Sequence, residues 1–139
     1  MADGYAGDVS PRDAWDWLED DADTVLVDCR TAAEWNYVGL PDLTGLGKET
    51  VTIEWVDFPA NERNPNFVDQ VKAAGIGPDR RVLFLCRSGV RSIGAARALT
   101  EAGYGRAYNV LEGFEGDKDG AGHRATVGGW KVAGLPWRQ

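Results

Sequence analysis

The sequence predicts an α/β fold in which a mainly parallel sheet carries helices on both faces. Short apolar runs, typical of buried strands, alternate along the chain with amphipathic segments at helical spacing. Such alternation is characteristic of βαβ units, whose crossover helices cover a parallel sheet. With 139 residues and 43% hydrophobic content, the chain is long enough for one core and too short for two ordinary domains. We therefore expect a single domain over residues 1–139, with its core at about 10–137.

The first half of the chain carries two helix signals and two strand signals. Ser10 can cap a helix whose first position is a proline, which suits that position. The β-branched run at 24–30 predicts a buried strand, and a short capped helix is expected after Thr31. Residues 36–49 are rich in Gly, Pro and Asp, which predicts an irregular loop. Residues 51–56 alternate enough to predict a second strand.

The second half repeats the pattern and then becomes irregular. A helix is expected over 64–74, where a glycine ends it, followed by a strand at 82–85 and an Ala-rich helix. Residues 107–111 predict the last strand. The Gly-rich tail at 112–139 carries tryptophans, and we expect it to wrap irregularly around the core, anchored by these aromatics. A short helical turn is expected near 129–133.

Cys86 lies at the turn between the strand at 82–85 and the Ala-rich helix, and Arg87 and Arg91 follow it. The free N–H groups and the positive end of that helix favour thiolate over thiol, and the arginine charges add to this effect. The same N–H groups form a cradle for an anion. Ligands bind at the carboxyl ends of strands in such sheets. The turn therefore predicts a nucleophilic sulfur inside a site for an anionic substrate.

Charge and composition exclude several classes of partner. The net charge is −7 with the acids spread along the chain, which argues against a nucleic-acid partner. The N-terminus is polar and acidic, and no apolar run approaches the roughly 18 residues that a membrane span needs. Two cysteines suit a reducing compartment better than a disulfide framework. We expect a cytoplasmic monomer that binds neither nucleic acid nor membrane.

Several motifs together resemble the rhodanese-like (thiosulfate) sulfurtransferase domain family. They are LVDCR at 26–30 with Glu34-Trp35, LFLCRSGVRS at 83–92, NVLEGF at 109–114, and the tail motifs GW at 129–130 and GLPW at 134–137. The resemblance covers about Ser10 to Trp137, as a single-domain member. The chain departs from many members at 36–45, where a longer loop replaces a His-Ile-Pro-Gly-Ala stretch.

The resemblance implies a rhodanese-like, five-stranded, mainly parallel α/β sheet and a sulfur-transfer reaction. It implies that Cys86 attacks the outer sulfur of thiosulfate or another donor and becomes a persulfide, which passes the sulfur to cyanide or to a small-molecule or protein thiol. Arg87 and Arg91 would contact the anionic donor. The persulfide would be held by backbone N–H groups in the segment Arg87, Ser88, Gly89, Val90, Arg91 and Ser92.

Four further residues have expected supporting roles or none. Asp28 and Arg30 are expected to brace the end of their strand rather than react. Cys29 is expected to be a small core residue. Since the strands that end at Cys29 and Cys86 are neighbours in the family fold, oxidation could join the two if their Cα atoms lie within about 7 Å. His123 is the single histidine and lacks nearby ligand partners, so neither a metal nor an organic cofactor is expected.

Two other function classes stay open at this point. A related loop serves the cell-cycle dual-specificity phosphatases and arsenate reductases, which also use a cysteine at this turn. Four residues separate Cys86 from Arg91 here, one fewer than in the phosphatase relatives, and the tighter ring should crowd a phosphoryl group. The other class is a non-catalytic rhodanese-like interaction module. Retention of Cys86 and both arginines argues against it.

Overall fold

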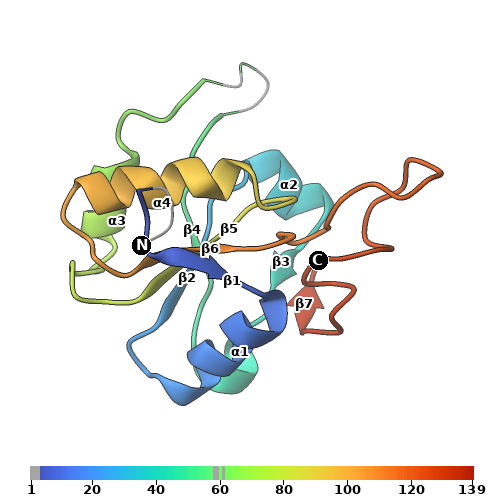
Figure 1. Ribbon diagram of the computed structural model, residues 1–139, viewed down its shortest axis with the longest axis horizontal. Helices are drawn as coiled ribbons and strands as arrows, with labels where there is room; N and C mark the ends of the chain where they lie inside the picture. Colours follow the sequence, from blue (N-terminus) through green and yellow to red (C-terminus); the bar gives the residue numbers. More distant parts are fainter. Residues whose placement is uncertain (1–3, 58–59, 61) are drawn as a thin grey trace.

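The computed structural model describes residues 4–57, 60 and 62–139. Its main sheet has five parallel strands in the order β1-β6-β5-β2-β4 (Figure 1). A separate antiparallel pair joins β3 and β7. The five-stranded parallel sheet expected from the resemblance is confirmed. The strands are β1 (Gly7–Val9), β2 (Val25–Asp28), β3 (Leu40–Pro41), β4 (Val51–Thr52), β5 (Val82–Leu85), β6 (Ala107–Val110) and β7 (Trp137–Arg138).

Helices cover both faces of the main sheet, as the sequence predicts. Figure 1 shows α1 on one face and α3 and α4 on the other. No helix in the described part of the chain is long and apolar enough to cross a membrane. The helices are α1 (Pro11–Asp20), α2 (Ala32–Tyr37), the 3₁₀ turn η1 (Thr44–Leu46), α3 (Phe67–Ala73) and α4 (Arg91–Glu101).

The central strand β5 shows why its sequence is apolar without interruption. Val82 and Phe84 pack into the core cluster that contains residues of α3 and α4. Leu83 and Leu85 pack into the opposite cluster, which contains residues of α1 and the tail. All four side chains are fully buried. Because alternate residues face two covered sides, every position in the strand must be apolar.

Local sequence signals explain where the first helices begin. The Ser10 hydroxyl accepts the N–H of Asp13 at 3.1 Å at the start of α1. Thr31 and Glu34 form a reciprocal capping box at the start of α2. Several elements are shorter than predicted, and the difference is largest in two of them. The strand expected over 51–56 leaves the ladder after Thr52, and the helix expected from residue 64 begins at Phe67.

Strand β1 is an element that the sequence analysis does not predict. Gly7 and Asp8, two of its three residues, are poor strand formers, so no local signal marks it. The strand exists because β6 offers a parallel partner, with Asp8 in register with Asn109. The sheet therefore begins before the expected core boundary near residue 10, and β1 brings Asp8 beside the central strands.

The C-terminal tail lies directly on the loop that follows β5. The N–H of Phe114 donates to the Cys86 carbonyl at 2.8 Å, and the N–H of Glu115 donates to the Arg87 carbonyl at 2.9 Å. Gly113 makes this contact possible, since a Cβ there would lie 2.6 Å from the Arg87 carbonyl carbon. Trp130 is fully buried and anchors the tail further along. The helical turn expected near 129–133 is present as a bond from the Ala133 N–H to the Gly129 carbonyl at 2.9 Å.

This close approach predicts that Gly113→Ala destabilises the protein. Gly113 also has a φ of +62°, so an added Cβ meets both backbone strain and a clash. We expect a loss of about 1–3 kcal/mol in the free energy of unfolding, measured by denaturant titration. Gly120→Ala is the matched control, since a Cβ there meets no atom within 4 Å. Equal midpoints for the two variants would contradict the proposed contact.

Candidate active site

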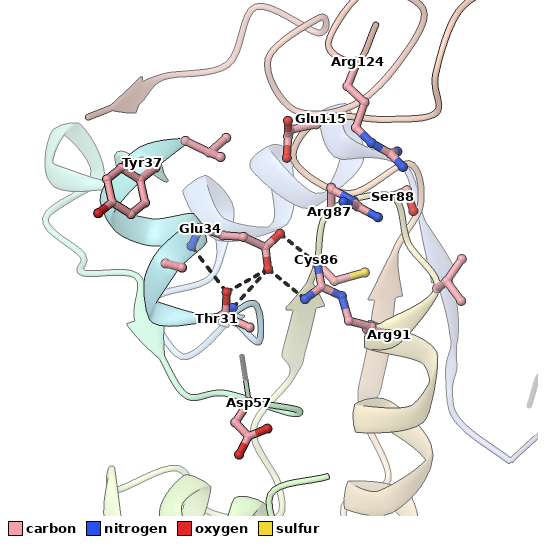
Figure 2. Close-up of a pocket in the computed structure, with 13 residues that line it drawn as sticks. Thr31, Glu34, Tyr37, Asp57, Cys86, Arg87, Ser88, Arg91, Glu115 and Arg124 are labelled. Atoms are coloured by element: carbon pink, nitrogen blue, oxygen red, sulfur yellow. Dashed lines mark hydrogen bonds and ion pairs between the residues drawn. The ribbon is translucent and has the colours of Figure 1, made fainter. Parts of the chain in front are cut away.

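A pocket of about 740 Å³ opens at the carboxyl end of the parallel sheet (Figure 2). The loop after β5 forms its base, α2 with its capping residue forms one wall, and the tail forms another. The sequence analysis anticipates the base but not the walls. The lining residues are Thr31, Ala33, Glu34, Tyr37, Val38, Asp57, Cys86, Arg87, Ser88, Val90, Arg91, Glu115 and Arg124.

Cys86 lies at the base of this pocket with 1% of its surface exposed. Its Sγ accepts the N–H of Gly89 at 3.1 Å. Helix α4 begins five residues later with Val90 as its N-cap, and no side chain caps it. The Ile93 N–H donates to the Val90 carbonyl at 3.2 Å, and no side chain among the described residues satisfies the N–H groups of Arg91 and Ser92. The positive end of the helix lies beside the cysteine loop.

A chain of hydrogen bonds runs behind the cysteine, from buried Ser92 and Asn109 to exposed Asp8. Sγ of Cys86 lies 3.2 Å from Oγ of Ser92, and the Ser92 hydroxyl donates to the Asn109 side-chain carbonyl. The Asn109 amide donates to the Asp8 carboxylate at 3.0 Å, which also accepts the Tyr5 hydroxyl at 2.8 Å. Because the Ser92 proton is directed to Asn109, the Ser92 lone pairs are free to accept the S–H of the resting thiol. The chain thus orients the sulfur.

Arg91 is held by a carboxylate rather than left open. Its Nη1 and Nη2 donate to the two Glu34 oxygens at 2.8 and 2.9 Å (Figure 2). The N–H and hydroxyl of Thr31 also donate to Glu34. Burial raises the pKa of Glu34, but the bonds and charge of Arg91 more than offset this and lower it below 4.5. Burial lowers the pKa of Arg91, but its hydrogen bonds to Glu34 and the charge of Glu34 raise it by more.

The structure distributes the loop residues differently from a uniform anion cradle. Arg87 is exposed and makes no ion pair or side-chain hydrogen bond among the described residues, and Ser88 and Val90 also line the pocket. Gly89 contributes its N–H to the sulfur. Ser92 is fully buried and does not line the pocket, so its side chain acts behind Cys86 rather than on a substrate. The pairing of Arg91 likewise leaves it less free charge for a donor than expected.

Asp28 and Arg30 lie outside the pocket, at the end of β2. Arg30 donates to both Asp28 oxygens, the shortest contact being 2.7 Å, and both side chains are fully buried. Cys29 is also fully buried, and this burial, followed by the charge of Cys86, raises its pKa well above 9.0. Both cysteines are free thiols. Within the described residues, no three His, Cys, Asp or Glu side chains are grouped as metal ligands.

The pocket residues from outside the cysteine loop, which include Glu34, Tyr37, Glu115 and Arg124, have no site role in the sequence analysis. The Thr-x-x-Glu spacing of the capping box could have located Glu34 near the start of α2. Tyr37 follows on the same helix. Glu115 and Arg124 reach the pocket only because the tail folds back onto the loop, and no local pattern in a Gly-rich segment indicates that.

The Glu34–Arg91 pair predicts an acid-dependent contribution to stability. The pKa of Glu34 is lower in the folded chain, so the contribution is present above pH 4.5 and is lost as the pH falls through the folded value. Glu34→Gln should therefore cost about 1 kcal/mol near neutral pH, since the pair is partly exposed, and the difference should shrink towards pH 3. Urea titrations across this range measure it. Exposed Glu49→Gln is the control, and a cost for Glu34→Gln that is independent of pH would contradict the role of the ion pair.

Comparison with known proteins agrees with this architecture over nearly the whole chain. The family model described as the STR4 middle domain matches residues 6–139. The solved structure of Rv0390 from M. tuberculosis superposes with a TM-score of 0.88 at 51% identity, covering 97% of this chain and 98% of that one.

Two curated relatives agree as well. "Uncharacterized protein RC0915" of Rickettsia conorii is 35% identical over 126 residues, which is 90% of this chain and 91% of that protein. A protein named "Sulfurtransferase" from Allochromatium vinosum is 33% identical over 97 residues, covering 70% of this chain and 74% of its own length. These matches agree with the five-stranded parallel sheet and with the cysteine loop at its carboxyl end. They show that the chain belongs to the rhodanese-like sulfurtransferase family.

Proposed function

We propose that the chain is a sulfurtransferase that carries a sulfane sulfur on Cys86. The Cys86 thiolate attacks the outer sulfur of thiosulfate, a new S–S bond forms, and sulfite leaves with the electrons of the broken S–S bond. An acceptor thiolate or cyanide then attacks the outer sulfur of the persulfide, and Cys86 leaves as the thiolate. A persulfide donor would load the same sulfur and release a thiolate instead.

The observation that carries this proposal is the setting of the Cys86 sulfur. It lies at the base of an open pocket, accepts the Gly89 N–H at 3.1 Å, and is close to the uncapped start of α4. N–H donors and a helix N-terminus stabilise negative charge, which a thiolate and an ionised persulfide both carry. An activated thiolate is what covalent catalysis by cysteine requires.

The pocket also suits the two partners of the proposed reaction. Arg87 lines it without an ion-pair partner in the described chain, so it is available to an anionic donor such as thiosulfate. Tyr37 and Val90 line the same pocket and are 80% and 72% exposed. This apolar rim leaves room for the approach of a thiol acceptor, either a small molecule or a protein. The protein named "Sulfurtransferase" among the relatives supports the same chemistry.

Phosphate chemistry fits this loop less well. Only four residues separate Cys86 from Arg91. Each terminal nitrogen of Arg91 already donates to Glu34, so its charge is paired with a carboxylate and is less available to the oxygens of a phosphoryl group. Sulfite leaves from thiosulfate with little protonation, whereas an alkoxide leaving group needs a placed acid. These features favour sulfur transfer over ester hydrolysis.

One test of the proposed function concerns the covalent intermediate. After incubation with thiosulfate, mass spectrometry of the wild-type protein should find one added sulfur atom on the peptide that contains Cys86. Cys86→Ser should gain none and should lose sulfur transfer, because a hydroxyl is far less nucleophilic than a thiolate. Cys29→Ser is the matched control and should still gain the sulfur. Retention of wild-type turnover by Cys86→Ser would refute the assignment.

Another test of the proposed function concerns the class of reaction. One preparation of the protein should transfer sulfur from thiosulfate to cyanide, with thiocyanate as the measured product, and should leave an aryl phosphate unhydrolysed. The expected selectivity follows from the short loop and the bonded Arg91, which place a phosphoryl group poorly for attack. Phosphatase turnover that disappears in Cys86→Ser, without any thiocyanate formation, would contradict the sulfurtransferase proposal and support a phosphatase function.

A further inference from the structure

We propose that Arg124, a tail residue with no role in the motifs of the cysteine loop, binds the charged end of an anionic sulfur donor together with Arg87. The inference rests on the proposed function and names a specificity residue for it. Both arginines line the pocket that contains Cys86: Arg124 belongs to the tail, and Arg87 belongs to the loop after β5 on which the tail packs. The donor class is a small anion with a tetrahedral oxyanion end, of which thiosulfate is the simplest.

The distribution of charge in the pocket selects these two arginines. Arg91 is the third arginine of the lining, and Glu34 occupies both of its terminal nitrogens. Arg87 and Arg124, by contrast, form no ion pair with any described carboxylate. A guanidinium without a carboxylate partner retains its charge and its paired donors for an oxyanion.

Besides Glu34, two carboxylates line the pocket, and neither cancels these arginines by direct pairing. Asp57 and Glu115 make no ion pair with the described cations. The charge of Glu115 acts on Lys131, whose pKa it raises against the larger lowering effect of burial. Lys131 therefore offsets part of the negative charge on the tail wall of the pocket.

The backbone holds Arg124 in place over the loop. Its Nη1 donates to the Gly116 carbonyl at 2.8 Å, and the Gly116 N–H donates to the Arg87 carbonyl at 3.2 Å. The N–H of Ala125 donates to the Glu115 carbonyl at 2.7 Å, which closes this segment of the tail. Figure 2 shows the Arg124 side chain reaching from the tail towards Arg87 and Ser88. Nε and Nη2 of Arg124 keep their N–H groups for a ligand.

This arrangement gives the donor a direction. A thiosulfate whose outer sulfur meets Cys86 would turn its oxygen-bearing end away from the base of the pocket, towards the mouth where Arg87 and Arg124 lie. Charge-assisted hydrogen bonds from two guanidinium groups would then align the S–S bond for attack. An uncharged donor would gain little from the same two groups, so Arg124 should govern which donors bind well.

The test is a steady-state comparison of Arg124→Gln with wild type, using thiosulfate and a persulfide with an uncharged organic group as alternative donors. The Cys86 thiolate takes the outer sulfur of this second donor and displaces a thiolate. Loss of a charge-assisted bond should raise KM for thiosulfate roughly tenfold or more, with a smaller effect on kcat and on the reaction with the organic persulfide. Arg124→Lys should restore part of the thiosulfate affinity, because it keeps the charge. Arg12→Gln is the matched control, since Arg12 also donates to a tail carbonyl, that of Ala133 at 3.0 Å, but does not line the pocket.

A binding measurement separates this inference from the proposed function. Calorimetric titration of thiosulfate into Cys86→Ser, with and without Arg124→Gln, reports the anion site without any turnover. Weaker binding in the double variant supports the inference even if no persulfide forms on the wild-type protein, an outcome that would refute only the proposed function. Unchanged affinity in the double variant, or equal KM increases for both donors, would overturn the role of Arg124.

Discussion

The position of the whole active site depends on one buried cation, the Arg30 guanidinium at the end of β2. Its charge is neutralised by Asp28, and it also donates to the Gly39 carbonyl at 2.6 Å and stacks on the Phe114 ring at 4.4 Å. A buried charge is costly unless it is paired and hydrogen-bonded, and these contacts stabilise all of the Arg30 guanidinium except Nη1, which has no hydrogen-bond partner among the described residues. Arg30 therefore joins the sheet, the chain before β3 and the tail at one point.

The tail residue that packs on Arg30 also determines the geometry of the cysteine loop. Phe114 donates its N–H to the Cys86 carbonyl, and the next residue does the same for the Arg87 carbonyl. These carbonyls follow the last residue of β5, where the sheet no longer supplies partners, and a buried carbonyl without a donor is costly. The tail satisfies them and, in doing so, carries Glu115 and Arg124 to the pocket. The same segment thus supports the cysteine loop and supplies a residue to the proposed substrate site.

Electrostatic groups around the sulfur are divided between rigid and available ones. Glu34 and Arg91 bind each other and connect α2 to the start of α4, which keeps one wall of the pocket at a constant distance from Cys86. Behind the sulfur, the uncharged side chains of Ser92 and Asn109 orient it, and the Asp8 carboxylate lies beyond them at the far end of the chain of hydrogen bonds. Arg87 and Arg124, which have no ion pair among the described residues, line the pocket and are available to the proposed anionic donor. Such a division suits a reaction in which a small anion must bind, react and leave.

The sequence by itself determined the α/β class, the central strands, the position of the cysteine and the family, because these depend on local patterns and motifs. Apolar runs and caps identify β2, β5, α1 and α2, and the motif around Cys86 is continuous in the chain. Tertiary structure alone decided the rest. β1 exists only through its pairing with β6, since Gly7 and Asp8 have no strand preference of their own. The partner of Arg91 and the approach of Arg124 likewise join residues far apart in the sequence, through side-chain contacts and an irregular tail whose path is set by close packing on Gly113 rather than by any periodic signal.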